Sequence, residues 1–494
     1  MNRQELLLGT AGAAALSAAS LFYAGGAAQP PALQGRRRLL MPPLIDATET
    51  GRCSLTAQTG MTALRGGQPT PTAGYNQSFL GPTLRLSPGS TAMRLHNALP
   101  EPTTTHWHGL LVPGESDGGP HQVIAPGDAW APELVIDQPP CTAWYHPHIH
   151  RRTALQVHWG LAGVIHVSDG RDDARGLPSR YGIDDLTLVL QDRSLDASGR
   201  MTYDTSMMTL MHGATGEDIL VNGQIGAVAA VPKAIARLRL VNGSNARIYS
   251  LFVDDGRPLH LVASEGGFLP APTSLSELVL SPGERAEVLI DLTDGRNVQL
   301  MSGPDTNQGP NGMFGRMQRV LNRVIDRSFP VLSVAVDETL PARITALPEA
   351  LDGSLPELAS DNLATRRFSL DMGPQAMMGM MNDNGDPFAI NGRAFDMRRI
   401  DAAVKLGTTE RWVVESTMLQ HPFHVHGASF QVVSEDGGRP RPQNAGWKDT
   451  VLVRQRAELL VRFKQPAPKE SPFMLHCHIL EHEDSGMMGQ FTVS

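Results

Sequence analysis

The sequence predicts an all-β protein made of several sandwich-like domains. Glycine and proline are abundant, at 49 and 37 residues, whereas aromatic residues make up only 5% of the chain. This composition favours many short strands joined by turns, as in β-sandwiches. A length of 494 residues allows two to four domains, each large enough to bury its own core.

The first 28 residues have the pattern of an export signal. Arg3 is followed by an apolar stretch rich in alanine, glycine and leucine from Leu6 to about Tyr23, and then by small residues up to Ala28. We expect cleavage near Ala28 and a periplasmic mature protein. The weakly hydrophobic signal resembles those of the twin-arginine route, but Gln4 stands where the second arginine is expected, so the export route stays open. The alternative is an uncleaved membrane anchor; otherwise no stable membrane insertion is expected.

Composition and strand patterns divide the remaining chain into domains. The apolar run Gly160–Ile165 ends the first domain, Leu186–Asp192 opens the second, and the alternating residues Ala236–Gly243 predict a half-buried strand and turn. The predicted segments are a linker at 29–43, a first domain at 44–168, a second at 187–335 and a third at 366–494. Because the second domain has no paired histidines, we expect it to be structural.

The run His476-Cys477-His478 is the most informative feature of the chain. In an extended segment successive side chains point to opposite sides, so the two histidines face one way and the cysteine the other. A thiolate, imidazoles and a distant thioether form the ligand set of a blue copper site, which predicts Cys477 and His482 as ligands with Met487 in the axial position. The missing second imidazole is expected from His421.

Paired histidines recur in four segments of the sequence. Each pair is separated by one residue, and the two pairs near the C-terminus echo the two upstream, as expected if two related β-domains face each other. The pairs are His106 and His108, His146 and His148, His424 and His426, and His476 and His478. Eight converging imidazoles suit a three-copper cluster better than a single tetrahedral zinc, which needs only four ligands.

These four segments resemble the signature motifs of the multicopper oxidases, and the resemblance covers nearly the whole mature chain. The likeness is strongest to bacterial copper-efflux (cuprous) oxidases and laccase-like enzymes, through Val112–Pro120 and Leu480–Met488. It implies three cupredoxin-like Greek-key β-sandwich domains, with copper ligands in the first and third. It also implies four copper ions, one of type 1, one of type 2 and two of type 3.

The resemblance assigns each ligand to one type of copper. The type 2 copper would be held by His106 and His424. The type 3 pair would be held by His108, His146, His148, His426, His476 and His478. The type 1 copper would be held by His421, Cys477, His482 and Met487.

The function that the resemblance implies is an oxidase. One-electron oxidation of Cu(I), and of phenolic substrates, at the type 1 copper would be coupled to the four-electron reduction of O2 to water at the cluster, serving copper tolerance. Asp117 and Glu483 match acidic residues that the family uses to deliver protons. Their alternative is that both are surface charges in turns.

A methionine-containing segment is the candidate site for substrate Cu(I). Soft thioether ligands suit Cu(I), and the residues concerned are Asp371, Met372, Met377, Met378, Met380 and Met381. Ordinary core packing is the alternative. Just before His421, where the relatives place an aspartate and a methionine for this copper, the chain has Thr417 and Leu419.

Charge and cysteine content exclude other classes. The formal net charge of −8 provides no basic surface for nucleic acid. Three cysteines cannot form a disulfide scaffold, although Cys53 and Cys141 could pair. We expect a monomer whose partners are O2 and a small reductant. The alternatives are a general laccase without a cuprous oxidase role, and a copper-free scaffold like the cell-division proteins of the same superfamily; a periplasmic copper carrier would need no three-copper site.

Overall fold

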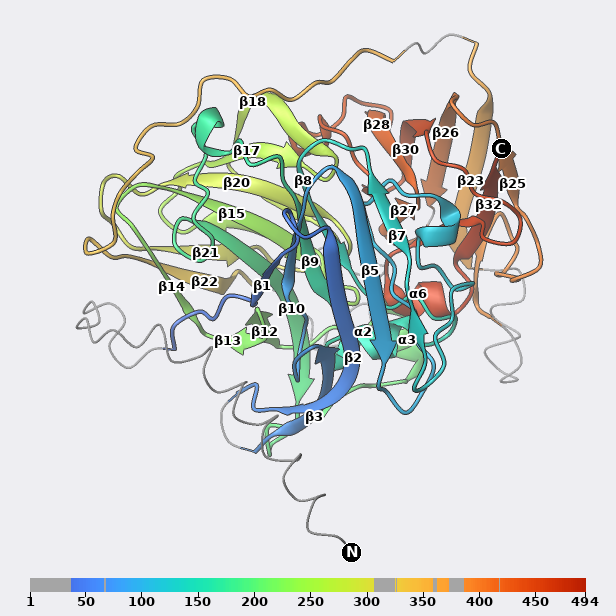
Figure 1. Ribbon diagram of the computed structural model, residues 1–494, viewed down its shortest axis with the longest axis horizontal. Helices are drawn as coiled ribbons and strands as arrows, with labels where there is room; N and C mark the ends of the chain where they lie inside the picture. The colour runs from blue at the N-terminus through green and yellow to red at the C-terminus, as the bar shows by residue number, and fades with distance from the viewer. Residues whose placement is uncertain are drawn as a thin grey trace, which may run out of the picture. The chain divides into compact units, whose positions relative to one another are not determined.

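The computed structural model describes residues 37–65, 68–305, 325, 327–358, 362–372, 386–416 and 418–494. The predicted export signal at 1–28 and the first part of the predicted linker lie outside the described residues. Within the described part, the strands form six sheets that pair off along the sequence (Figure 1). The prediction of an all-β fold is confirmed. None of the helices described has the length and apolar character required to cross a membrane.

The first pair of sheets is built from strands between residues 44 and 167. One sheet has the order β1 (Leu44–Asp46), β4 (Thr83–Leu86), β9 (Gly163–Val167) and β8 (Cys141–Tyr145). The other contains β3 (Thr70–Tyr75), β2 (Arg52–Thr62), β5 (Gly89–Asn97), β6 (Ala129–Trp130) and β7 (Glu133–Ile136). Buried and exposed residues alternate along β2 and β5, so each strand turns one face toward a shared core.

Cys53 and Cys141 both lie in the core of this first pair of sheets, and both are free thiols. The apolar run predicted to form the last strand of the domain is divided in two. Gly160 ends the helix α2 (Thr153–Trp159) with a φ of 119°, a conformation that favours glycine, and β9 starts only at Gly163.

The middle pair of sheets is built from strands that lie between residues 185 and 302 and from β22 at 329–336. The larger sheet contains β13 (Gln224–Ile225), β12 (Asp218–Val221), β10 (Asp185–Leu195), β15 (Ile235–Asn242), β20 (Arg285–Asp291), β17 (Leu259–Ser264) and β18 (Gly267–Leu275), with β11 (Met201–Thr202) beside β10. The smaller sheet has the order β14 (Val228–Val231), β22 (Phe329–Val336), β21 (Val298–Ser302), β16 (Tyr249–Val253) and β19 (Leu278–Leu280). Leucine and valine side chains of both sheets form one core.

Strand β15 differs from the prediction of a half-buried strand, because all eight of its residues are buried. The alternating arginines Arg237 and Arg239 are buried, and Arg239 Nη1 lies 3.4 Å from the hydroxyl of Thr142 in β8 of the first pair of sheets. Glu287 receives hydrogen bonds from both guanidinium groups, and Asp185 accepts two more from Arg239. Charge pairing is what permits arginines to be buried at these positions.

The third pair of sheets is built from β23 at 365–372 and from strands that lie between residues 388 and 493. One sheet has the order β24 (Phe388–Ile390), β23 (Thr365–Met372), β26 (Thr409–Ser416), β30 (Arg456–Phe463) and β28 (Ala428–Glu435). The other has the order β25 (Ala402–Val404), β32 (Met488–Val493), β31 (Phe473–Cys477), β27 (His421–Val425) and β29 (Thr450–Val453). Two short helices, α3 (Met207–His212) and α6 (Leu480–Asp484), contact each other near the end of β31. The domain boundaries 44–168, 187–335 and 366–494 stay a prediction.

Candidate metal centre

The structure brings the four paired-histidine segments together. In the first pair of sheets, His106 and His146 form an antiparallel bridge, with backbone N–O distances of 2.8 and 3.2 Å. In the third pair, β27 and β31 are antiparallel neighbours and place His424 opposite His476. The two halves meet directly, since the Nε2 atoms of His106 and His424 lie 3.4 Å apart.

The hydrogen bonds of His106 and His424 fix which nitrogen faces the centre. Nδ1 of His106 donates to the carbonyl oxygen of Asp117 at 3.0 Å, and Nδ1 of His424 donates to that of Asp449 at 2.9 Å. A neutral imidazole carries one proton, so both Nε2 atoms present lone pairs to each other across 3.4 Å. Two facing lone pairs repel, and a cation between them would remove that repulsion.

A second group has the same arrangement and consists of His148, His426 and His476. Nε2 of His476 lies 3.2 Å from Nε2 of His426 and 3.3 Å from Nε2 of His148. Nδ1 of His426 donates to Asp117 Oδ2 at 2.8 Å, and Nδ1 of His476 donates to its neighbouring carbonyl, that of Cys477, at 2.9 Å. Their inward nitrogens are again acceptors without a proton.

A third group contains His108, His146 and His478. Nδ1 of His108 lies 3.4 Å from Nε2 of His146, whose Nδ1 donates to the carbonyl of Pro147 at 2.8 Å. Both ring nitrogens of His478 are buried and have no hydrogen-bond partner among the described residues. A buried polar atom without a partner costs about 1–3 kcal/mol, and a metal ligand bond would satisfy it.

The fourth group surrounds Cys477 and contains His421 and His482. The Cys477 Sγ lies 3.3 Å from Nδ1 of His421 and 3.7 Å from Nδ1 of His482. Nε2 of His482 donates to the carbonyl of Met211 in α3 at 3.2 Å, so its Nδ1 is left free to bind metal. Met487 is fully buried in the same core.

Burial keeps several of the clustered histidines neutral. Burial lowers the pKa of His421 and of His424 to about 4, and it holds the pKa of His108 and His482 well below the usual range. The rings are therefore neutral at neutral pH, the form that binds metal. Burial also raises the pKa of the Cys477 thiol, so metal binding would have to displace its proton.

The donor set fits copper. Imidazole nitrogens suit copper, and two imidazoles with one thiolate form the equatorial set of a blue copper site. The three all-histidine groups lie next to one another. A structural zinc ion would instead need one site with four ligands in a tetrahedron. The residues present therefore fit the four-copper arrangement, while the role of each ligand stays a prediction.

Asp117 and Glu483 are buried, each with a side chain about 1% exposed, so neither is a surface charge. Asp117 Oδ2 accepts the hydrogen bond from His426 described above. Glu483 contacts two histidines of the second group, with Oε2 3.2 Å from Nδ1 of His476 and Oε1 3.5 Å from Nδ1 of His148. Burial alone would raise the pKa of Glu483, but the adjacent His148 and His476 lower it to about 2. Proton delivery by these carboxylates stays a prediction.

Only part of the candidate site for substrate Cu(I) lies within the described residues. Asp371 is half-buried in β23, and Met372 is the last residue of that strand. Met377, Met378, Met380 and Met381 lie outside the described residues, as does Thr417. The prediction that this segment collects Cu(I) is therefore untested.

Three residues that contact the centre have no signature in the sequence. Asp449 lies within ligand distance of His108 and His424. The backbone of Met211 and the ring of Phe388, which stacks on His482 with ring centroids 4.1 Å apart, cover the Cys477 group. No spacing pattern links these residues to the histidine pairs, because Asp449 precedes β29, Met211 lies in α3 and Phe388 begins β24.

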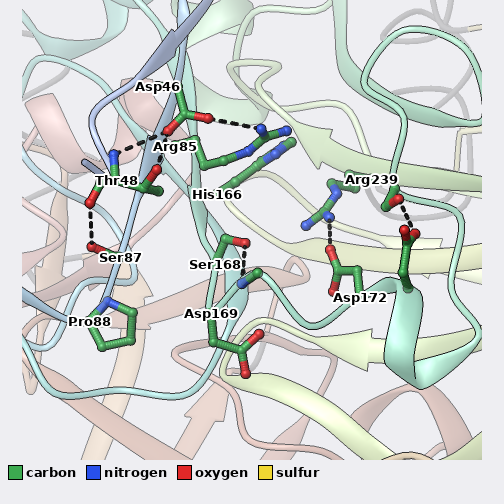
Figure 2. A pocket seen from close by; sticks show the side chains of 13 residues that line it. Asp46, Thr48, Arg85, Ser87, Pro88, His166, Ser168, Asp169, Asp172 and Arg239 are labelled. Carbon is green, nitrogen blue, oxygen red and sulfur yellow. Dashed lines mark hydrogen bonds and ion pairs between the residues drawn. The ribbon is translucent and has the colours of Figure 1, made fainter. Parts of the chain in front are cut away.

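A separate cavity of about 570 Å³ lies between the first and middle pairs of sheets (Figure 2). Its charged side chains already have ion-pair partners, some of them outside the cavity. Asp46 Oδ2 lies 3.0 Å from Arg85 Nη1, and Asp172 Oδ2 lies 3.2 Å from Arg239 Nη2. Because these charges are matched, the cavity does not call for a bound ion, and the histidine groups remain the candidate site.

Three regions of the chain match family models described as multicopper oxidase: residues 56–172, 185–311 and 369–494. The laccase-like multi-copper oxidase CueO from the lignin-degrading bacterium Ochrobactrum sp. is a solved structure with the same fold. It is 42% identical, with a TM-score of 0.84, over 92% of this chain and 100% of that one. The expectation of cupredoxin-like sandwiches is thereby confirmed, and family membership implies copper binding.

Curated relatives carry a different name. "Cell division protein FtsP" of Xenorhabdus nematophila is 35% identical over 459 residues, and that of Dickeya dadantii is 36% identical over 459 residues. Each alignment covers 92% of both chains.

These relatives contradict the predicted function, an oxidase of Cu(I) and phenols that serves copper tolerance, and they favour the cell-division alternative. The error has a physical reason. Ligand motifs indicate which metal a fold can bind, but they do not determine the biological role of the protein. What the family matches, the relatives and the shared structure establish together is that this chain belongs to the multicopper oxidase family.

Proposed function

We propose that this chain is a cell-division protein of the bacterial periplasm, built on a cupredoxin scaffold. The observation that carries the proposal is its identity of 35–36% to proteins named for cell division, over 92% of both chains. The similarity to these proteins extends over all three sandwiches and is not limited to the ligand motifs, which supports a role in common with them. The apolar N-terminal pattern from Leu6 to Tyr23 supports export.

We also propose that this scaffold binds four copper ions, in contrast to the copper-free scaffold considered from the sequence. Support comes from the facing lone pairs of His106 and His424, from the unpartnered ring of His478 and from the thiol of Cys477 between two imidazoles. Copper in these groups would supply one-electron redox chemistry. Copper that binds only the folded state would also add its net binding free energy to the stability of that state.

Complementation of a deletion strain tests the cell-division role. Cells of the source bacterium lacking the gene should form longer cells with delayed septa under osmotic or detergent stress, and the wild-type gene should restore normal length. Cys53→Ser serves as the matched control, since it changes a buried free thiol outside the ligand groups. Normal cell length and septation in the deletion strain under all these stresses would overturn the proposal.

The same deletion strain tests whether the cell-division role requires bound copper. A Cys477→Ser, His424→Ala variant should lose copper from two ligand groups. Restored division by this variant would show that the division role does not need copper, whereas failure to restore division, at normal protein level, would show that it does. A metal count on purified wild-type protein, by mass spectrometry, decides the copper proposal independently.

A copper-dependent oxidoreductase activity is the second candidate, with O2 as the acceptor and a small molecule as the donor. One observation favours it: Cys477 is bonded on both sides to histidines of two other ligand groups, His476 and His478. This provides a short covalent path between the sulfur and those groups. Oxygen consumption by the copper-loaded protein, compared with Cys477→Ser, tests this candidate without reference to cell division.

A further inference from the structure

His108 differs from the other clustered histidines in the ring nitrogen that it turns away from the centre, and Asp449 is the partner of that nitrogen. Five of the eight clustered histidines donate a hydrogen bond through Nδ1, which leaves Nε2 facing inward; they are His106, His146, His424, His426 and His476. His108 instead points Nε2 at Asp449 Oδ1, 3.1 Å away. A carboxylate only accepts, so Nε2 carries the proton and Nδ1 is the nitrogen turned toward His146.

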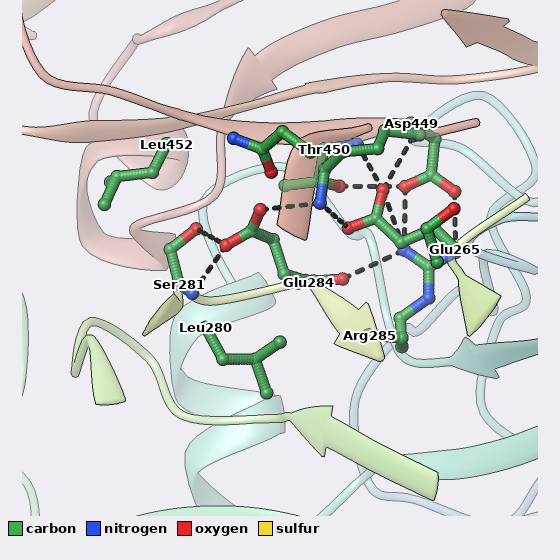
Figure 3. A network of polar contacts seen from close by, with 12 residues as sticks. Glu265, Leu280, Ser281, Glu284, Arg285, Asp449, Thr450 and Leu452 are labelled. Carbon is green, nitrogen blue, oxygen red and sulfur yellow. Dashed lines mark hydrogen bonds and ion pairs between the residues drawn. The ribbon is translucent and has the colours of Figure 1, made fainter. Parts of the chain in front are cut away.

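Asp449 is itself held by the middle pair of sheets. Arg285, at the start of β20, donates from Nη1 to Asp449 Oδ1 at 2.7 Å and from Nη2 to Oδ2 at 2.6 Å. Such a two-pronged contact fixes the plane of the carboxylate as well as its position. Glu265 Oε2 accepts from the backbone nitrogens of Asp449 and Thr450, at 2.7 and 2.9 Å (Figure 3).

Further charges fix this arrangement in place. Lys448 Nζ lies 3.0 Å from Glu265 Oε1 and 2.9 Å from Glu284 Oε1, and all three side chains are at most 4% exposed. Ser281 donates through both its backbone nitrogen and its hydroxyl to Glu284 at 2.7 Å. The network is therefore buried and largely satisfied by its own members, which gives it little freedom to rearrange.

The glycine after the first histidine pair allows the network to approach. Gly109 has a φ of 92°, and a Cβ atom there would collide with the Arg285 guanidinium and come within 3.1 Å of Asp449 Oδ2. Thr450 adds a second contact, since its hydroxyl donates to Asp449 Oδ1 at 2.9 Å and lies 3.2 Å from Nε2 of His108.

We infer that Asp449 is a positioning residue that selects Nδ1 of His108 as its metal-binding nitrogen, and that Arg285 and Glu265 hold Asp449 in place. The expected change in copper affinity rests on the proposed copper binding. The expected position of the proton on the His108 ring does not. It gives the middle pair of sheets a part in building the centre, although these sheets contribute none of the clustered histidines.

The test replaces the charged pair as a unit. The double variant Asp449→Leu, Arg285→Leu removes the acceptor without leaving an unpaired buried charge. In metal-free protein, ¹⁵N NMR of the histidine rings should show His108 changing from the Nε2-protonated form toward a mixture of forms. In copper-loaded protein, affinity at the group of His108, His146 and His478 should fall about 10–100-fold, the usual effect of losing an outer partner of a ligand. The blue absorption of the Cys477 site should be unchanged.

Glu284→Gln is the matched control, because it alters a buried carboxylate of the same network that does not touch Asp449. It should keep the wild-type ring signal of His108 and the wild-type copper affinity. If the double variant does not fold, Asp449→Asn keeps the shape and should shift both readouts in the same direction. Wild-type ring signals and copper affinity in the folded variant would overturn the inference. A wild type that binds no copper would refute the proposed copper binding, while the His108 ring signal would still decide this inference.

Discussion

Replacing Glu287 by glutamine should destabilise the protein by about 3 kcal/mol at neutral pH. The Glu287 side chain is about 2% exposed and accepts hydrogen bonds from Thr142 at 2.6 Å, from Arg237 Nε at 2.9 Å and from Arg239 Nη1 at 3.1 Å. Burial alone would raise its pKa, but Arg237 and Arg239 outweigh burial and lower the pKa to about 2 from an ordinary value of 4.5. At about 1.4 kcal/mol for each pKa unit, this shift corresponds to roughly 3 kcal/mol.

An independent estimate agrees. Removing one partner of a buried ion pair costs about 3–5 kcal/mol, because the other charge is left uncompensated. The carboxylate has a lowered pKa, so its contribution is present above pH 4.5 and is lost as the pH falls from 4.5 toward 2. Wild-type stability should therefore fall through this range more steeply than that of Glu287→Gln.

The assay is urea denaturation of the metal-free protein, followed by tryptophan fluorescence at pH 7 and at several pH values between 5 and 2. Glu415→Gln is a suitable control, since the carboxylate of Glu415 is 44% exposed and its ion pairs contribute little. A Glu287→Gln protein within 1 kcal/mol of wild type at pH 7, or one with an unchanged acid dependence, would refute the reasoning.

Three further predictions concern the metal groups. Cys477→Ser should abolish blue absorption of the copper-loaded protein while far-ultraviolet circular dichroism stays unchanged; retained blue colour would mean that another sulfur binds the copper. Gly109→Ala should lower the thermal midpoint and weaken copper binding, because the added Cβ collides with Arg285 and sits at a φ of 92°, whereas Gly437→Ala, where a Cβ meets nothing within 4 Å, should be milder. Copper at the Cys477 site should bind more weakly as the pH falls, because protons compete for the Cys477 sulfur, and the loss should be steepest below pH 4, since the His421 ring is neutral above its pKa of about 4 and protonated below it; a copper affinity that stays constant down to pH 3 in an equilibrium titration would contradict this.

The sequence predicted which histidines come together better than it predicted their surroundings. Ligand pairs two residues apart on extended segments must share a face, so the placement of His476 and His478 on one side of Cys477 follows from strand geometry alone. The burial of Arg237 and Arg239 could not be foreseen, because alternating charged and apolar residues ordinarily mark a strand with one face in water. Only the facing carboxylates of Glu287 and Asp185, distant in sequence from these arginines, reverse that expectation.

Asp449 escaped prediction for a similar reason. A single aspartate before a strand has no local signature, and its importance arises from Arg285 and His108, which lie 164 and 341 residues away in the chain. The function was wrongly predicted for a different reason. Motif spacing identifies a fold and a metal chemistry, and relatives of one fold can serve quite different cellular tasks.

Each of the three all-histidine groups takes ligands from both ends of the described chain, as the pairing of His106 with His424 across 318 residues illustrates. A ribosome must therefore have made almost all of this sequence before any of these sites can close. Metal would then bind after folding and link segments that are distant in the sequence. Bringing these segments together costs little further entropy once the sandwiches between them have folded. If the groups bind copper as proposed, the metal must be delivered to a finished fold and not to a growing chain.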